Sequence, residues 1–515
     1  MTFAHFLLAS TGLSTSAYSN ISHAALYNLS TSVGGRLFSG APVAHPCFRS
    51  SPGDRAECVT VQNQYLNETY RTDNFGAWIN TQWETCQSTG AQCLLDSSDP
   101  TGTIPSESCQ LGSVPGLFID VRNSEDVAAA FKFSKETRVP LVVKNTGHDY
   151  KGRSSAPNSL ALWVRWDYSL VPPKIELRVH FYTNVSVHPD IGLSQAGVQW
   201  AEAYEFADAH NITLVGGSDK TVGVVGGWLQ GGGHGVLSNT MGLGVDRVVE
   251  GGTFGVVLDA TLLASPARNF GTSWRTTVSN GGAQGWGGFS MSNLAILVNP
   301  VLDAGDAATS MAPLIDFGQK LLDEGVPGAG KLVTTYPSFF AFFNEFTSGH
   351  VATVGASLAI ASRLVDKASF ATPEKRAALV DALQATNDAG PGMIIQLTAP
   401  VSYAYEGGTS VTDAWRSSLY HVTAIAPWAW NATVAEKRAA YQSASTAIDN
   451  LRKITPDAAY QNEADVYEPN HEVTFWGSHY QQLLRIKRKY DPRQLLDCWQ
   501  CIGWNAQSPR FSCYL

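Results

Sequence analysis

Residues 139–155 have the sequence Val-Pro-Leu-Val-Val-Lys-Asn-Thr-Gly-His-Asp-Tyr-Lys-Gly-Arg-Ser-Ser, in which a short apolar run leads into a loop rich in turn residues. The apolar, β-branched segment 141–143 predicts a buried strand. Asn145 and Gly147 then supply turn geometry and let the backbone come close to a flat or phosphorylated group. His148 would stand at the end of the strand, so the segment predicts a cofactor site.

A single histidine after a strand is most often a structural residue, so His148 alone does not define a function. The wider pattern is more specific. Asn-Thr-Gly-His-Asp-Tyr at 145–150, followed by Gly-Arg-Ser-Ser at 152–155, resembles the flavin-attachment loop of the vanillyl-alcohol oxidase / p-cresol methylhydroxylase superfamily, and most closely its berberine-bridge-enzyme-like fungal oxidoreductases. In that family the histidine at this place carries FAD through a covalent bond to the isoalloxazine ring, and the resemblance implies this role for His148.

The overall composition is that of a soluble globular protein that acts on a small molecule. A chain of 515 residues can hold two or three domains, and no apolar run reaches transmembrane length. A net charge of -9, a pI of about 5.7 and the lack of a long basic block argue against nucleic acid or an anionic membrane as partner. We expect a monomer with a small-molecule substrate and dioxygen as its partners.

Eight cysteines lie near the two ends of the chain and predict disulfide bonds. Six Asn-X-Ser/Thr sequons also favour a secretory route. Residues 1–46 are expected to be a leader and a loosely ordered arm, although the only apolar segment there, at 6–10, is a poorly formed signal peptide. The cysteines are Cys47, Cys58, Cys86, Cys93, Cys109, Cys498, Cys501 and Cys513.

The densest glycine region, 216–235, includes Thr-Val-Gly at 221–223 and Gly-Gly-Gly-His-Gly at 231–235. Such small residues let backbone N–H groups approach a pyrophosphate, but a buried glycine-rich turn explains the spacing equally well. The pattern looks like the family's second FAD-binding segment. Members with two covalent flavin links have a cysteine shortly before Thr-Val-Gly, where this chain has Asp219, so the resemblance implies one link only.

Strand 118–121 and helix 124–134, with Ser124 as N-cap, precede the flavin-attachment loop. The resemblance implies an α+β fold, with a two-part FAD-binding domain of the p-cresol methylhydroxylase type and an α/β substrate domain built on a large antiparallel sheet. We expect the leader arm at 1–46 to be followed by the FAD-binding domain at 47–265, the substrate domain at 266–455, and a C-terminal segment at 456–515 that returns to the FAD domain.

Two places depart from the family pattern. Segment 164–194 does not resemble the family's connecting strands, and Glu250 runs directly into Gly-Gly-Thr-Phe-Gly-Val-Val at 251–257, where relatives have a further strand pair and a helix. Missing strands would expose apolar faces and unpaired edges. A catalytically defective, flavin-free secreted member is therefore the alternative prediction.

The C-terminal motif Tyr-Gln-Asn-Glu at 460–463 is the second region that resembles the family. Sugar-oxidising and cannabinoid-forming relatives have a tyrosine base after the asparagine, whereas this chain has Glu463. A carboxylate whose pKa is raised in an apolar pocket could take the substrate proton; a surface or capping carboxylate is an equal alternative. Asn462 and Tyr480 complete the predicted catalytic set.

The predicted function is oxidation of an alcohol, amine or sugar carbon by hydride transfer to covalently held FAD, with dioxygen as acceptor; the resemblance alone points to secondary metabolism. A third alternative is a thiol-redox protein that uses Cys498-Trp-Gln-Cys501, and no metal site is predicted because this pair lacks a second ligand pair. The residues predicted to bind FAD are Asn145, Thr146, Gly147, His148, Asp149, Tyr150, Gly152, Ser154 and Ser155, then Thr221, Val222, Gly223, Gly226, Gly227, Gly231, Gly232, Gly233 and Gly235, and further on Gly255 and Val256.

Overall fold

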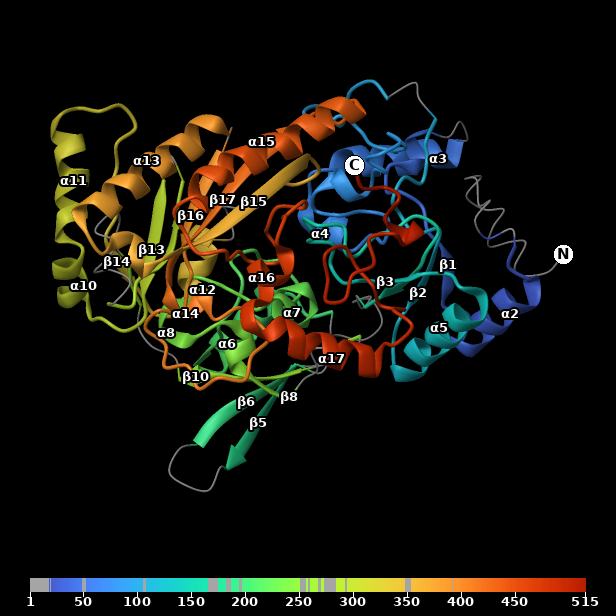
Figure 1. Ribbon diagram of the computed structural model, residues 1–515, viewed down its shortest axis with the longest axis horizontal. Coiled ribbons are helices and arrows are strands. Elements are labelled where there is room, and N and C mark those ends of the chain that lie inside the picture. Colours follow the sequence, from blue (N-terminus) through green and yellow to red (C-terminus); the bar gives the residue numbers. More distant parts are fainter. Residues whose placement is uncertain are drawn as a thin grey trace.

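The computed structural model has an α+β architecture, as predicted, with two main groups of strands that are each covered by helices (Figure 1). None of the helices in the described ranges is long and apolar enough to cross a membrane. The described residues are 18, 20–48, 52–104, 108–164, 175–181, 187–193, 197–250, 256–257, 260–266, 270–272, 284–291, 294–347, 353–390 and 392–515.

A four-stranded sheet near the N-terminus carries the flavin-attachment loop. Its strands are β1 (Leu37–Ser39), β2 (Leu117–Asp120), β4 (Leu160–Trp163) and β3 (Leu141–Lys144), in that spatial order. The pairs β2–β4 and β4–β3 are parallel, while β1 is antiparallel to β2. This order places the end of β3, and therefore His148, at one edge of the sheet.

Two helices lie close together at this end of the chain, α2 (His23–Ser32) and α5 (Ser124–Thr137). The apolar face of α5 packs Ala130 and Phe133 into the core. The predicted cap was wrong by one residue. Asn123, not Ser124, is the N-cap, and its side chain accepts from the backbone N–H of Asp126 at 3.0 Å.

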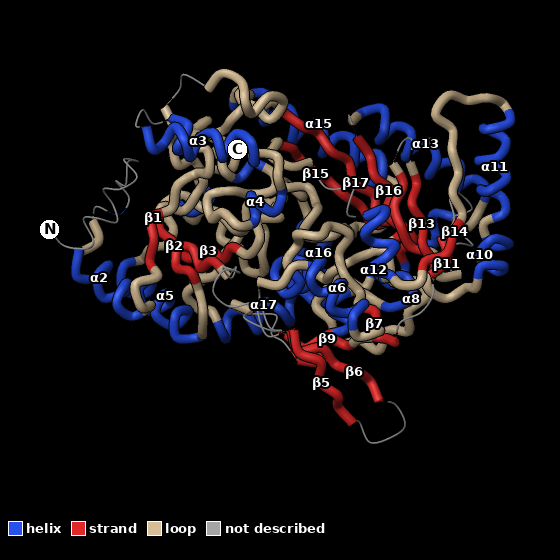
Figure 2. Tube along the Cα trace, turned by 180° about the vertical axis from the view of Figure 1, so that it is seen from behind, coloured by secondary structure: helices blue, strands red, loops and turns tan. Residues whose placement is uncertain are grey.

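Both departures from the family pattern meet in a second four-stranded sheet. Its order is β5 (Ile175–Phe181), β6 (Val187–Leu193), β9 (Ala260–Leu263) and β8 (Val248–Glu250), and all pairs are antiparallel. The hairpin β5–β6 extends away from the body of the protein (Figures 1 and 2). Strand β9 thus has a neighbour on each side. The junction residues 251–255 lie outside the described residues.

The large antiparallel sheet predicted for the substrate domain has seven strands, and every pair in it is antiparallel. Its spatial order is β14 (Thr334–Tyr336), β11 (Phe270–Thr272), β13 (Ala295–Asn299), β12 (Gly287–Ser290), β16 (Gly392–Leu397), β17 (Ser418–Trp428) and β15 (Ser357–Asp366). A minor two-stranded sheet joins β7 (Ile212–Thr213) to β10 (Ser265–Pro266).

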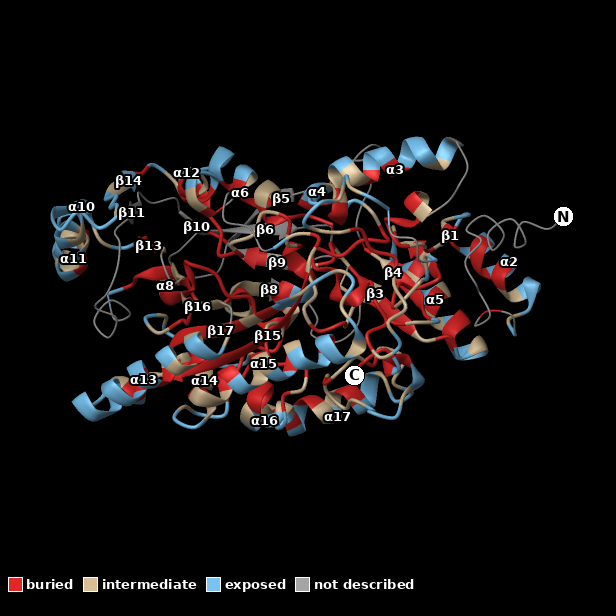
Figure 3. Ribbon diagram, turned by 90° about the horizontal axis from the view of Figure 1, so that it is seen from above, coloured by how far each residue is buried: buried red, intermediate tan, exposed pale blue. Residues whose placement is uncertain are grey.

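Two long helices cover one face of the large sheet, α13 (Pro373–Ala389) and α15 (Val434–Arg452) (Figure 1). Side chains alternate along a strand. On β17, Tyr420, Val422 and Ala424 therefore belong to the core under these helices, while His421 points to the opposite face. Figure 3 shows β15 and β17 as buried strands. The opposite face of the sheet is the one that meets the candidate site.

The remaining helices are short, and several of them surround the glycine-rich segment or the ends of the large sheet. Helix α15 begins with a capping box between Thr433 and Glu436. The other helices are α3 (Pro52–Gln64), α4 (Glu68–Thr72), α6 (Trp200–Ala209), α7 (Leu229–Gly231), α8 (Ser238–Met241), α10 (Ala304–Ser310), α11 (Ala312–Asp323), α12 (Phe339–Phe342), α14 (Ala414–Ser417), α16 (His471–Trp476) and α17 (Tyr480–Tyr490).

The predicted disulfide bonds are confirmed, and one of them joins the two ends of the chain. Cys86 pairs with Cys513 across 427 residues, so the C-terminal residues are linked covalently to the N-terminal part of the chain. The other three bonds are local: Cys47–Cys58, Cys93–Cys109 and Cys498–Cys501. Bridging of the last pair agrees with a structural role for this CxxC.

Removing the long-range disulfide is expected to destabilise the protein far more than removing a local one. A cross-link that closes a long loop restricts the unfolded chain strongly, and its loss typically costs about 2–5 kcal/mol. Replacing Cys86 and Cys513 with serine should therefore lower the Tm, measured by calorimetry without reductant. The matched control replaces Cys498 and Cys501, which are three residues apart. A control that lowers the Tm equally would contradict this account.

Candidate active site

The flavin-attachment loop brings His148 against the glycine-rich segment. Gly147 has a positive φ of 95°, which glycine tolerates, and its carbonyl accepts from the N–H of Ile79 at 3.1 Å. The turn places Nε2 of His148 2.7 Å from the Thr221 hydroxyl and 3.5 Å from Oδ1 of Asp219. Two segments that are distant in the sequence thus meet at this histidine.

The contacts of His148 determine which ring nitrogen is available for chemistry. Burial lowers the pKa of the imidazole, and the charge of Asp219 opposes this shift only in part. The ring is therefore neutral near neutral pH. Because Nε2 faces Thr221 and Asp219, the proton sits best on Nε2, and Nδ1 keeps its lone pair.

The glycine-rich segment owes its glycines to close packing against other predicted site residues. A Cβ atom on Gly223 would lie 2.1 Å from Oδ1 of Asn145, and one on Gly231 would lie 2.1 Å from Nδ2 of Asn462. A Cβ on Gly227 would meet nothing within 4 Å. Gly227 is exposed although its neighbours are buried, so the backbone there borders an open space.

The C-terminal motif lies against the glycine-rich segment. The Asn462 side chain donates to the carbonyl of Gly227 at 2.8 Å, and Gln461 donates to the carbonyl of Gly231 at 3.3 Å. Glu463 follows directly and lies beside a histidine of the glycine-rich segment. The first loop, the glycine-rich segment and the C-terminal motif therefore converge on one place.

Glu463 lies at the centre of a polar cluster with two histidines. Nε2 of His234 is 3.3 Å from Oε1 of Glu463, and Nδ1 of His421 on β17 is 3.7 Å from Oε2. Gln396 on β16 faces His421 across the strand pair and donates to Oε2 at 3.4 Å. The large sheet therefore contributes two of the four side chains in this cluster.

Aromatic rings enclose the cluster. The Tyr460 ring lies edge-on to both His234 and His421, with centroids 4.8 and 5.8 Å away, and Trp415 packs against both imidazoles. Tyr460 and Trp415 belong to a small apolar core. These rings exclude water from one side of Glu463 and leave its polar contacts to the histidines and Gln396.

The prediction of a raised pKa for Glu463 was wrong. Burial does raise the pKa of this carboxyl group, but the charge and hydrogen bond of His234, with further help from His421 and Gln396, lower it to about 2. Burial lowers the pKa of His421 to about 3. Glu463 is therefore ionised at neutral pH and His421 is neutral. The apolar neighbours predicted from the sequence are present, and the two histidines outweigh them.

The other predicted residues are placed as follows. Burial raises the pKa of the Tyr150 hydroxyl, and the nearby negative charges of Glu463 and Asp219 add to this shift. Tyr480 instead packs in a separate core with Phe475, and its hydroxyl accepts from a backbone N–H at 3.3 Å. Val256 packs on the main core, and Gly255 lies outside the described residues.

Sequence reasoning did not assign roles to His234 and His421. His234 stood in the quoted Gly-Gly-Gly-His-Gly run, so its place next to the cofactor segment was a usable signal. His421 lies in the middle of an apolar strand, Ser-Leu-Tyr-His-Val-Thr-Ala. A histidine that alternates with core residues on such a strand must point to the opposite face, and this signal was overlooked.

Comparison with known proteins identifies the class. The family "Berberine and berberine like" matches residues 459–503. The chain is 31% identical to FAD-linked oxidoreductase ffsJ of Aspergillus flavipes, over 94% of this chain and 92% of the relative. It is 33% identical to FAD-linked oxidoreductase OXR2 of Pyricularia oryzae, over 92% and 91%. The crystal structure of the VAO-type flavoprotein MtVAO615 from Myceliophthora thermophila C1 superposes with a TM-score of 0.79 at 23% identity, over 95% and 97% of the two chains.

The protein is therefore a flavin-dependent oxidoreductase with the VAO-type fold. More specifically, the chain belongs to the berberine-bridge-enzyme-like FAD-linked oxidoreductases, and FAD is its cofactor. The residues present fit this group. A Cβ on Gly227 would meet nothing within 4 Å, so the backbone there can be approached closely. The buried side-chain oxygens Ser155 Oγ and Asp219 Oδ2 have no hydrogen-bond partner within the described ranges.

Proposed function

We propose that the protein oxidises a small-molecule alcohol, amine or sugar carbon, with FAD held covalently by His148 and dioxygen as final acceptor. Bound FAD supplies the acceptor for a hydride from the substrate carbon. The observation that carries the proposal is the convergence of the His148 loop, the glycine-rich segment and the Asn462–Glu463 motif. We further propose that residues 47–265 and 456–515 hold the cofactor and that 266–455 hold the substrate.

His148 would form the covalent bond through Nδ1, because Thr221 and Asp219 face its Nε2. Asp219 stands where relatives with two links have a cysteine, and a carboxylate supports a single link. Its negative charge also favours the loss of the Nε2 proton to the Thr221–Asp219 pair when Nδ1 becomes bonded.

Substrate would lie between the glycine-rich segment and the polar face of the large sheet. Gln396 and His421 project from that sheet toward Glu463. The proton that leaves the substrate heteroatom would enter the cluster around Glu463. Four disulfide bonds support the secretory setting that is part of the proposal.

Covalent attachment can be tested without knowing the substrate. Purified protein should be yellow, and the colour should stay with the acid-precipitated pellet. In His148→Ala the pellet should be colourless, because the imidazole that would form the bond is gone. The control is His210→Ala, because His210 is exposed and its ring contacts Phe206 of its own helix rather than the candidate site. A colourless soluble wild type would favour the defective-member alternative, and a yellow His148→Ala pellet would refute the role of His148.

A further inference from the structure

The cluster of His234, His421 and Glu463 has the spacing of a metal site. One nitrogen or oxygen atom from each side chain lies within 4.8 Å of the other two. The closest separation, from Nε2 of His234 to Oε1 of Glu463, is 3.3 Å. Ligand atoms in a tetrahedral zinc site with bonds of about 2.0–2.1 Å are roughly 3.3 Å apart. Small side-chain rotations would therefore bring all three atoms to bonding positions.

The hydrogen bonding of the imidazoles is incomplete, and a cation would supply part of what is missing. His421 is 0% exposed, and neither of its ring nitrogens makes a hydrogen bond within the part of the chain that the structure describes. Nδ1 of His234, which is 9% exposed, also lacks a partner. Buried polar atoms are normally satisfied, and each exception calls for a physical reason. A cation bound by Nδ1 of His421 would give that buried nitrogen a partner.

The surroundings of the cluster resemble the support that metal ligands require. Gln396 donates to Oε2 of Glu463 at 3.4 Å and fixes the carboxylate. Trp415 and Tyr460 pack on both histidine rings. Hydrogen bonds to the ligands and an apolar wall around them orient the ligands and control access of water.

We propose that His234, His421 and Glu463 bind one divalent transition-metal ion of the Zn²⁺ type, and that a hydroxyl or carboxylate oxygen of the substrate takes the open coordination position. Two histidines and one carboxylate with an open position are a ligand set of catalytic zinc sites. The ion would hold the substrate oxygen and make its hydroxyl more acidic. Metal binding stands on the geometry alone, while the substrate contact rests on the proposed function.

The test uses tag-free holoprotein that has been treated with a chelator and then dialysed against Zn²⁺. Metal content per chain is measured by mass spectrometry, and flavin content by absorbance of the same sample. Wild type should hold about one Zn²⁺. His421→Gln and Glu463→Gln should bind Zn²⁺ at least about 10-fold more weakly, while the exposed control His210→Gln should match wild type.

The outcomes separate this inference from the proposed function. Yellow wild type that binds no Zn²⁺, or variants that bind it as wild type does, would overturn the metal site. Zinc bound to colourless protein would support the site and overturn the flavin function. X-ray absorption of the wild-type zinc complex gives a measurement independent of variant folding. Imidazole and carboxylate ligands are expected, and a sulfur ligand would refute the assignment.

Discussion

An Arg71→Met variant is expected to lose about 3–5 kcal/mol of unfolding free energy, because the change leaves a buried carboxylate without its partner. The Arg71 and Glu84 side chains form an ion pair and are both 0% exposed. Arg71 also donates to the carbonyls of Trp78 and Tyr65 at 2.6 and 3.0 Å. Chemical denaturation of the holoprotein, followed by tryptophan fluorescence, measures the loss.

Two further variants test whether burial is the reason. Lys320→Met breaks the ion pair between Lys320 and Glu324, two side chains that are 69% and 54% exposed. This variant should change the unfolding free energy by less than about 1 kcal/mol. Adding Glu84→Met to Arg71→Met should restore part of the loss, because no unpaired buried charge remains. Equal denaturation midpoints for Arg71→Met and wild type would contradict this reasoning.

The Arg71–Glu84 pair also links stability to the flavin site. Glu84 accepts from the backbone N–H of Trp78 at 2.9 Å, and the Trp78 indole donates to Ser154 of the attachment loop at 2.8 Å. The next residue, Ile79, donates to the carbonyl of Gly147. Loss of the pair should therefore reduce flavin incorporation as well as stability.

The attachment loop could be predicted from the sequence because its signals are local. An apolar strand, a turn glycine and a histidine follow one another within a few residues, and the structure places them as β3, Gly147 and His148. The cap of α5 was missed by one residue because Asn123 and Ser124 are both good N-cap residues. Local patterns predict the elements well and their ends less well.

The polar cluster could not be predicted in the same way. His234 and Glu463 are 229 residues apart, and His421 lies on β17 of the large seven-stranded sheet. The pKa of Glu463 depends on these neighbours, so the sequence around it, Asn-Glu-Ala-Asp-Val, gave the wrong direction. The pairing of β6 with β9 is likewise a long-range contact. It joins the two regions, 164–194 and the stretch after Glu250, that each depart from the family pattern when taken separately.

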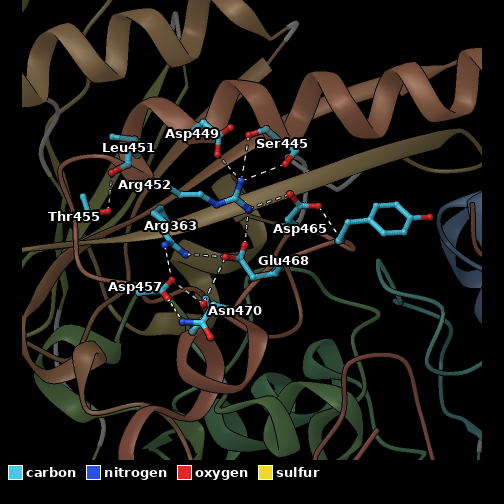
Figure 4. A network of polar contacts seen from close by, with 12 residues as sticks. Arg363, Ser445, Asp449, Leu451, Arg452, Thr455, Asp457, Asp465, Glu468 and Asn470 are labelled. Atoms are coloured by element: carbon cyan, nitrogen blue, oxygen red, sulfur yellow. Dashed lines mark hydrogen bonds and ion pairs between the residues drawn. The ribbon is translucent and has the colours of Figure 1, made fainter. Parts of the chain in front are cut away.

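Replacing Arg452 with methionine is expected to have a comparably large effect on the segment that carries Glu463. Arg452 on α15 pairs with Glu468 at 2.5 Å and Asp465 at 3.0 Å (Figure 4). Both carboxylates are almost fully buried. Arg363 on β15 binds the other oxygen of Glu468 at 3.1 Å. Buried ion pairs thus connect the C-terminal segment to β15 of the large sheet and to the covering helix α15.

Without Arg452, the Asp465 carboxylate loses its ion pair, and Glu468 keeps its ion pair with Arg363. We expect a loss of about 3–5 kcal/mol and faster hydrogen exchange in residues 457–468, read out by mass spectrometry. The control is Arg438→Met, an exposed position on the same helix. Faster hydrogen exchange in Arg438→Met but not in Arg452→Met would contradict the role of the network.

Glu463 lies inside the segment 457–468 that Arg452 holds in place. Arg452→Met should therefore also bind Zn²⁺ more weakly than Arg438→Met, because the Glu463 carboxylate would no longer be held against His234 and His421.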